Sequence, residues 1–196
     1  MKVNEKISSN VLRNRYVFAI AFSALIAVSN FFIVPLPGGI PIVLKNMFVI
    51  LSGTVLGRFY GGISALILIT AGLIGLPVFA IPGGFGVFLT PLGGYIIGYF
   101  FAGLCSGLIA GVPKNSEKKI CLVFIVRLSI ASFSGFVLIL LSGSLYLVFL
   151  NSMSLKAALA AGFLPFLLGD TIKLIISIPL ALKLRPIAAR FLNPGE

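Results

Sequence analysis

Two ionisable side chains stand inside an apolar stretch and are the strongest candidates for binding a ligand. Asp170 and Lys173 lie in a segment that runs from about residue 155 to 184. The other three acidic residues belong to polar ends or a polar loop, so Asp170 is the carboxylate expected at membrane depth. A spacing of three places Lys173 on the same face of a helix. Charged groups at such depth are costly and usually face a bundle interior or a cavity.

These two groups suit complementary parts of a small ligand. A carboxylate accepts hydrogen bonds from N–H groups, and a lysine ammonium donates to an acid. A ligand that carries a urea or amide at one end and an acid at the other would therefore fit them. The alternative is an internal ion pair that satisfies itself, and such a pair is weak evidence even for stability.

Lys45 and Asn46 are further candidates for the same site, near the start of a predicted span. Adjacent residues on a helix point in different directions, so one of them could face the pocket while the other does not. Lys45 could instead snorkel to the membrane interface, and Asn46 could form a hydrogen bond between helices.

The stretch from 75 to 92 is apolar but rich in Gly and Pro, so it is not expected to form a regular helix. Non-helical backbone near a membrane must be buried in protein or line a cavity. We expect a loop that folds back over the mouth of the bundle. Gly83 and Gly84 would offer backbone N–H donors there, and Phe79 and Tyr95 would form aromatic walls. The alternative is a turn with a purely structural role.

The composition predicts an integral membrane protein. Of 196 residues, 59% are hydrophobic and only 10% are charged, the mean hydropathy is +1.18, and a soluble domain carries roughly 25% charged residues. Because the sequence has no histidine, histidine-based metal sites, catalytic triads and proton relays are excluded. It also has no P-loop motif and no pair of carboxylates at membrane depth. We therefore expect no enzymatic activity, no catalytic residue and no metal site.

Basic residues predict the orientation of the chain. Fifteen basic and four acidic residues give a net charge of +11, but the basic residues are scattered at segment ends and form no stripe for nucleic acid. Eleven of them fall in the N-terminal region, the turn at Arg58, the 113–119 loop and the C-terminal tail, whereas the opposite loops hold only Lys156. The positive-inside rule then makes both termini cytoplasmic. Asp170 and Lys173 would lie in the outer to middle part of the bundle.

Apolar segments separated by Gly and Pro predict an all-α membrane protein with six transmembrane helices in one compact domain over residues 1–196. A tight turn is expected at 35–39 and a bend near Gly162 or Pro165. Residues after 182, including Arg185, are expected to form a polar tail. Most spans are near the ~20 residues needed to cross a bilayer, and the second and third are short. The expected spans are about 16–34, 42–56, 63–74, 93–110, 120–141 and 155–182.

Small residues recur at four-residue spacing, which lets helices approach closely. Ala19, Ser23 and Ala27 form one such row on the first span, and glycines including Gly103 form others. The usual meaning is packing inside the bundle. The row on the first span could instead be a docking face for a partner subunit.

Several blocks together resemble the BioY family, the biotin-binding S-components of energy-coupling factor (ECF) transporters. They occur in the family's order and span nearly the whole chain, and their combination is specific although each alone is weak. The blocks are Ile40-Pro41-Ile42-Val43-Leu44-Lys45-Asn46, Leu51-Ser52-Gly53 with Leu56-Gly57, Gly75-Leu76-Pro77-Val78-Phe79-Ala80, Pro91-Leu92-Gly93-Gly94-Tyr95-Ile96-Ile97-Gly98, Leu164-Pro165-Phe166 and Gly169-Asp170-Thr171-Ile172-Lys173.

The resemblance implies a multi-pass six-helix bundle in the plasma membrane of a prokaryote, with an outward-facing pocket for biotin as transported ligand and no covalently bound cofactor. It implies that Asp170 and Lys173 contact biotin. It also implies that the row at Ala19, Ser23 and Ala27 packs against a transmembrane coupling (T) subunit, which joins two ATP-binding subunits. ATP hydrolysis would then belong to those partners.

Three positions depart from the family pattern. Lys45 stands where the family commonly has Gln, Thr90 replaces a usual Gly, and Pro82 stands near an Asn that contacts biotin in some relatives. A second lysine near the pocket would favour a more anionic ligand. Two other functions therefore stay open: an S-component for another small anionic vitamin such as lipoate, and a stand-alone facilitator or channel.

Overall fold

The computed structural model describes most of the chain. The turn expected at 35–39, the substitution at Pro82 and most of the polar 113–119 loop lie outside the described residues. The described residues are 2–34, 42–79, 83–114 and 121–193.

The described residues are nearly all helical, as predicted. Among them, α1 (from Asn10), α4, α5 and α7 are long and apolar enough to cross a membrane. The elements are α1 (Lys2–Ser29), β1 (Ile33–Val34), β2 (Ile42–Val43), α2 (Lys45–Leu56), α3 (Tyr60–Leu73), the 3-10 helix η1 (Phe85–Leu89), α4 (Leu92–Ala110), α5 (Leu122–Asn151), α6 (Leu155–Gly162) and α7 (Leu164–Leu192).

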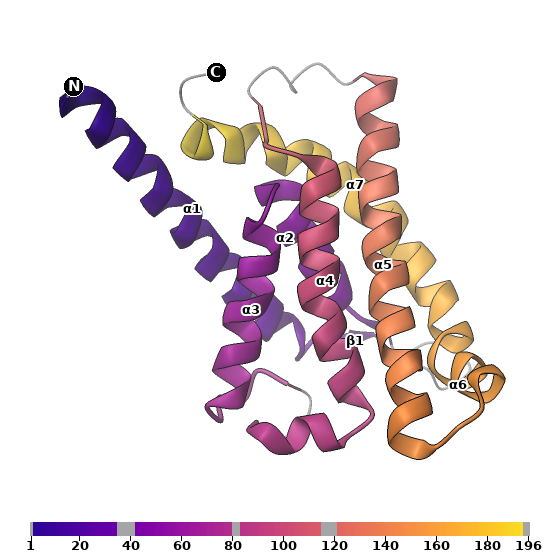
Figure 1. The fold of residues 1–196 in the computed structure, drawn as a ribbon. Coiled ribbons are helices and arrows are strands. Elements are labelled where there is room, and N and C mark those ends of the chain that lie inside the picture. The colour runs from indigo at the N-terminus through magenta and orange to yellow at the C-terminus, as the bar shows by residue number, and fades with distance from the viewer. Residues whose placement is uncertain (1, 35–41, 80–82, 115–120, 194–196) are drawn as a thin grey trace.

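Successive long helices run in alternating directions through the bundle (Figure 1). As a result α1 begins and α7 ends at the same end, drawn at the top of Figure 1, which we call the terminal end. The opposite end holds η1 and α6, and we call it the η1 end.

Helix α2 is the centre of the bundle. It packs against α1, α3, α4, α5 and α7, and all but two of its residues are buried. At 1.5 Å per residue its twelve residues cover only ~18 Å. A helix surrounded by other helices does not itself face lipid, so its length is not set by the thickness of the hydrocarbon layer.

Glycine allows α2, α3 and α4 to touch through their backbones. A Cβ on Gly103 would lie 2.6 Å from the carbonyl oxygen of Gly61, and a Cβ on Gly53 would lie 2.6 Å from that of Gly103. No larger residue fits at such distances without a shift of backbone. The small-residue row that contains Gly103 therefore packs inside the bundle, in line with the usual meaning of such rows.

The helix that carries the first predicted span, 16–34, begins and ends at other residues than that span. Helix α1 already begins at Lys2 and stops at Ser29, and the chain then turns into β1, which pairs antiparallel with β2. Hydrophobicity marks the part of a helix that lies in apolar surroundings, and it does not register polar turns that extend the same helix. The short strand pair depends on two segments meeting in space, which local composition does not encode.

The helices that carry the last two predicted spans also differ from them in extent. Helix α5 does not stop near 141 but continues to Asn151, where Ser152 has the left-handed φ of 49°. The single predicted span 155–182 is two helices, because the chain breaks at Phe163 between α6 and α7. The predicted bend near Gly162 or Pro165 is thereby confirmed.

The predicted polar tail is helical, and Arg185 is fully buried rather than exposed. Its guanidinium donates to the carbonyl of Thr54 in the last turn of α2. It also donates to the carbonyls of Ala110 and Gly111 at the end of α4, at 3.1 and 3.2 Å. The last carbonyls of a helix lack partners within the helix and carry partial negative charge, so a planar cation with several donors can hold two such ends together.

Arginines cap other helix ends in the same region. Arg15 donates through Nε and Nη2 to the Leu192 carbonyl at the end of α7, at 3.2 and 3.1 Å. Arg127 donates to the Ile109 carbonyl near the end of α4, at 2.7 Å. Three arginines of the terminal end thus bind carbonyls at or near helix C-termini.

We predict that Arg185→Met destabilises the protein. Breaking such a buried charged contact costs roughly 3 kcal/mol, which corresponds to ~6–12 °C in Tm for a chain of this size. Loss of helical circular dichroism on heating the purified protein in detergent measures the shift. Arg190→Met is the matched control, because Arg190 is exposed on the same helix. Equal Tm values for the two variants would show that the guanidinium does not hold these helix ends together.

Candidate functional site

An apolar cavity of about 150 Å³ opens at the η1 end of the bundle. It is formed by the beginnings of α2, α4 and α7 together with the segment that follows α3. Four residues predicted for the site line it, Lys45, Asn46, Phe79 and Tyr95, although they are far apart in sequence. The complete described lining is Asn30, Lys45, Asn46, Phe79, Leu92, Tyr95, Ile96, Tyr99, Leu140 and Phe166.

Lys45 is the first residue of α2, and its side chain is buried in the cavity wall. It is only 4% exposed, so the alternative in which it snorkels to the interface is wrong. Its Nζ donates to the Val78 carbonyl at 3.0 Å and lies 5.4 Å from the centre of the Phe79 ring. Lys45 therefore fastens the segment 75–79 against the cavity.

The same segment is anchored on its other side by α3. Gly72 of α3 leaves the room that the Phe79 ring occupies. The Gly72 carbonyl also accepts a hydrogen bond from Gly84 N at 2.7 Å, and Gly83 packs against it. Gly83 and Gly84 are not among the described residues that line the cavity. Their predicted role as donors to a ligand stays a prediction, and the contacts they do make anchor the loop to α3.

Tyr95 is a wall of the cavity and also ties helices together. Its hydroxyl donates to the Gly162 carbonyl at the end of α6, at 2.7 Å. Its ring meets that of Phe166 edge-on, with 6.1 Å between centroids. The aromatic wall is therefore held by both a hydrogen bond and ring packing.

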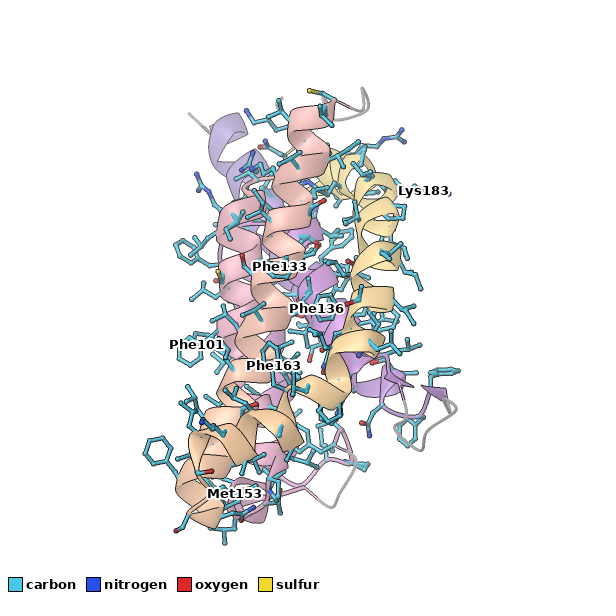
Figure 2. All side chains as sticks on the ribbon, turned by 90° about the vertical axis from the view of Figure 1, so that its right-hand side faces the viewer. Phe101, Phe133, Phe136, Met153, Phe163 and Lys183 are labelled. Atoms are coloured by element: carbon cyan, nitrogen blue, oxygen red, sulfur yellow. The ribbon has the colours of Figure 1, made fainter. Side chains whose placement is uncertain are left out.

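Asp170 and Lys173 form a buried ion pair on α7. Among the described residues, neither lines the main cavity. Asp170 lines a second apolar cavity of about 50 Å³ between α5 and α7. Figure 2 shows Phe136 and Phe163 in the space between these two helices.

Asn46 connects the ion pair with the main cavity. It lines the cavity, and its side chain is close enough to the Asp170 carboxylate to interact with it. Oδ2 of Asp170 has no well-formed hydrogen bond within the described part of the chain. A buried carboxylate oxygen in that state can accept from a ligand N–H group.

Two polar lining residues were missed from the sequence. Asn30 and Tyr99 are buried and face the cavity. Asn30 follows the last residue of α1. A polar residue close to a predicted turn is common, so its position gave no signal of a binding site. Tyr99 stands one helical turn after Tyr95, and that spacing was the available signal.

The small-residue row of α1 is already largely covered within the chain. Ala19 and Ser23 are buried and Ala27 is half-buried. The Ala19 carbonyl accepts a hydrogen bond from Ser64 of α3 at 3.0 Å. Docking of a partner through this row stays a prediction, and Ala27 is its most accessible member.

Comparison with known proteins agrees with this architecture. The BioY family model matches residues 3–190. A biotin transporter BioY of Thermotoga maritima is 35% identical over 165 residues, covering 84% of this chain and 91% of the relative. One of Rhodobacter capsulatus is 31% identical over 166 residues, covering 80% and 85%.

A solved structure has the same fold. The crystal structure of an S-component for biotin from an ECF-type ABC transporter superposes with a TM-score of 0.72 at 29% identity, covering 94% of each chain. Together with the apolar helices, these matches identify a membrane protein with an S-component fold. The chain belongs to the BioY family.

Proposed function

We propose that this chain is the biotin-binding membrane subunit of an ECF-type vitamin uptake transporter. The observation that carries the proposal is the juxtaposition at the η1 end of an apolar cavity and a buried ion pair, linked by Asn46. Membership of the BioY family supports it, because the relatives are named biotin transporters. The role is binding and delivery, without catalysis by this chain.

Biotin presents the groups that this arrangement suits. Its ureido ring carries two N–H donors and a carbonyl, and we propose that Asp170 accepts the former while Lys173 donates to the latter. This differs from the expectation that Lys173 holds the acid, because Lys173 lies against Asp170 and both side chains face the same end of a ligand. Asp170 and Lys173 contact each other, so a ligand that binds both must compete with that contact. Replacing one charge-assisted contact by several around a desolvated ligand is favourable only if each group finds a partner. Phe79 and Tyr95 would pack on the apolar part of the ligand.

We propose six crossings of the membrane, with α2 and α3 as short, shielded spans and the terminal end in the cytoplasm. The concentration of basic residues at that end supports this orientation, and the cavity would then face outward. In the same proposal a transmembrane coupling subunit and two ATP-binding subunits in a prokaryotic plasma membrane complete the transporter.

We expect Asp170→Asn and Lys173→Ala each to weaken biotin binding by roughly tenfold or more, about 1.4 kcal/mol, the size of one lost charged hydrogen bond. Equilibrium titration of the purified protein with labelled biotin measures the effect. Lys156→Ala is the control, because Lys156 is an exposed lysine at the same end of the bundle. Because each single change leaves a buried charge without its counter-charge, Tm is measured alongside. Titrations like those of the wild type for both variants would reject this site.

Ligand identity is tested by titration with biotin, desthiobiotin and lipoate. All three carry an acid, but lipoate has no ureido group for Asp170 and Lys173, so biotin should bind most tightly and lipoate least. Tighter binding of lipoate would favour an S-component for that vitamin. Uptake by vesicles that contain this chain alone, without ATP-binding subunits, would favour a stand-alone facilitator.

The proposed docking row is tested at its accessible residue. Ala27→Leu should leave biotin affinity unchanged and strongly reduce ATP-driven uptake by the assembled transporter. Ala19→Leu is the contrasting variant: Ala19 is fully buried, so its enlargement should lower Tm by overpacking. Uptake at the wild-type rate by Ala27→Leu would remove the row from the partner interface.

A further inference from the structure

In the part of the chain that the structure describes, Lys45 is a buried cation with no carboxylate beside it. Within the described residues Asp170 is the acidic side chain at this end of the bundle, and it is engaged by Lys173. The ammonium of Lys45 contacts the neutral carbonyl of Val78 and the face of the Phe79 ring. Charges at membrane depth are normally paired, so an unbalanced ammonium in a cavity wall points to an anionic occupant.

The ammonium also has hydrogen-bonding capacity to spare. A lysine carries three N–H donors, and the bond to Val78 uses one of them. Because Lys45 lines the cavity, a carboxylate placed there can accept from the same ammonium. A charge-assisted bond to a carboxylate is stronger than a bond to a neutral carbonyl.

The segment 75–79 is the part of the wall best able to respond. It lies between α3 and η1 outside any helix, and it closes the cavity through Phe79. The cavity of about 150 Å³ is smaller than the roughly 300–1,000 Å³ of small-molecule sites. We infer that this wall moves to admit a ligand of the size of biotin, because it lies outside any helix and the side chain of Lys45 fastens it.

We propose that Lys45 determines specificity for anionic ligands: its ammonium seats the ligand carboxylate and, through Val78, makes the position of the segment 75–79 depend on that charge. The ligand would span the cavity, with its ureido ring at Asp170 and Lys173 and its acid at Lys45. This inference rests on the proposed function. It adds that Lys45 both binds the charged group of the ligand and holds the segment 75–79 over the cavity.

A neutral analogue separates the effect of charge from that of shape. Biotinol, in which an alcohol replaces the acid, keeps the ureido ring and the alkyl chain. The wild type should bind biotin more tightly than biotinol by roughly tenfold or more, because only biotin presents an anion to Lys45. In Lys45→Gln the preference should fall to about twofold or less through weaker binding of biotin. Lys45→Arg, which keeps the charge, should retain it, and Lys156→Gln is the matched surface control.

Movement of the wall is measured in the wild-type site. A nitroxide is attached to Leu76→Cys, a half-exposed position in the segment, after Cys105 and Cys121 are replaced by alanine. Biotin should reduce the mobility of the label and biotinol should not. This measurement stands even if a Lys45 variant fails to fold.

The outcomes are distinct. Biotin and biotinol bound equally by the wild type, or the same preference in Lys45→Gln as in the wild type, would overturn the role of Lys45 in specificity. Equal effects of both ligands on the label would overturn the coupling to the segment 75–79. Failure of biotin to bind the wild type at all would instead overturn the proposed function.

Discussion

The guanidinium of Arg185 lies where the ends of α2 and α4 meet, and it joins α7 to both of them. Fifteen basic residues and only four acidic ones leave too few carboxylates to pair the cations of this chain. Backbone carbonyls at helix C-termini take that role for Arg185, Arg15 and Arg127. Each contact satisfies carbonyls that the helix leaves unpaired and balances a cation at the same time.

Cations at the η1 end also bond to carbonyl or carboxylate oxygens, but these oxygens do not belong to helix ends. Lys45 bonds to a carbonyl in an irregular segment rather than in a rigid helix end. Lys173 contacts Asp170, the one carboxylate that the described residues place at this end. A helix end cannot move away from its cation without breaking the fold, whereas a short loop can. Cations at the terminal end therefore join helix ends, whereas under the proposed function those at the η1 end exchange partners with a ligand.

The limits of a helix were predicted well where the hydrophobicity of its own residues sets them. They were predicted poorly where contacts with other helices set them. The centres of α2, α3 and α4 are close to their predicted spans. The last predicted span stopped at 182, but α7 continues to Leu192. In that added part Arg185, which was expected in a polar tail, is buried and bonds to carbonyls of two other helices. The bend at Gly162 was predicted, since glycine and proline act locally through the backbone.

From the sequence alone come the membrane class, the family resemblance and the unusual polar residues Asp170, Lys173, Lys45 and Asn46, because rare charged groups in apolar segments are visible without any contact map. Only the tertiary structure decided that Lys45 and Asn46 share one cavity while Asp170 and Lys173 close on each other behind it. The physical reason is that periodicity gives the face on which a side chain lies, but not which residues from other helices lie opposite that face.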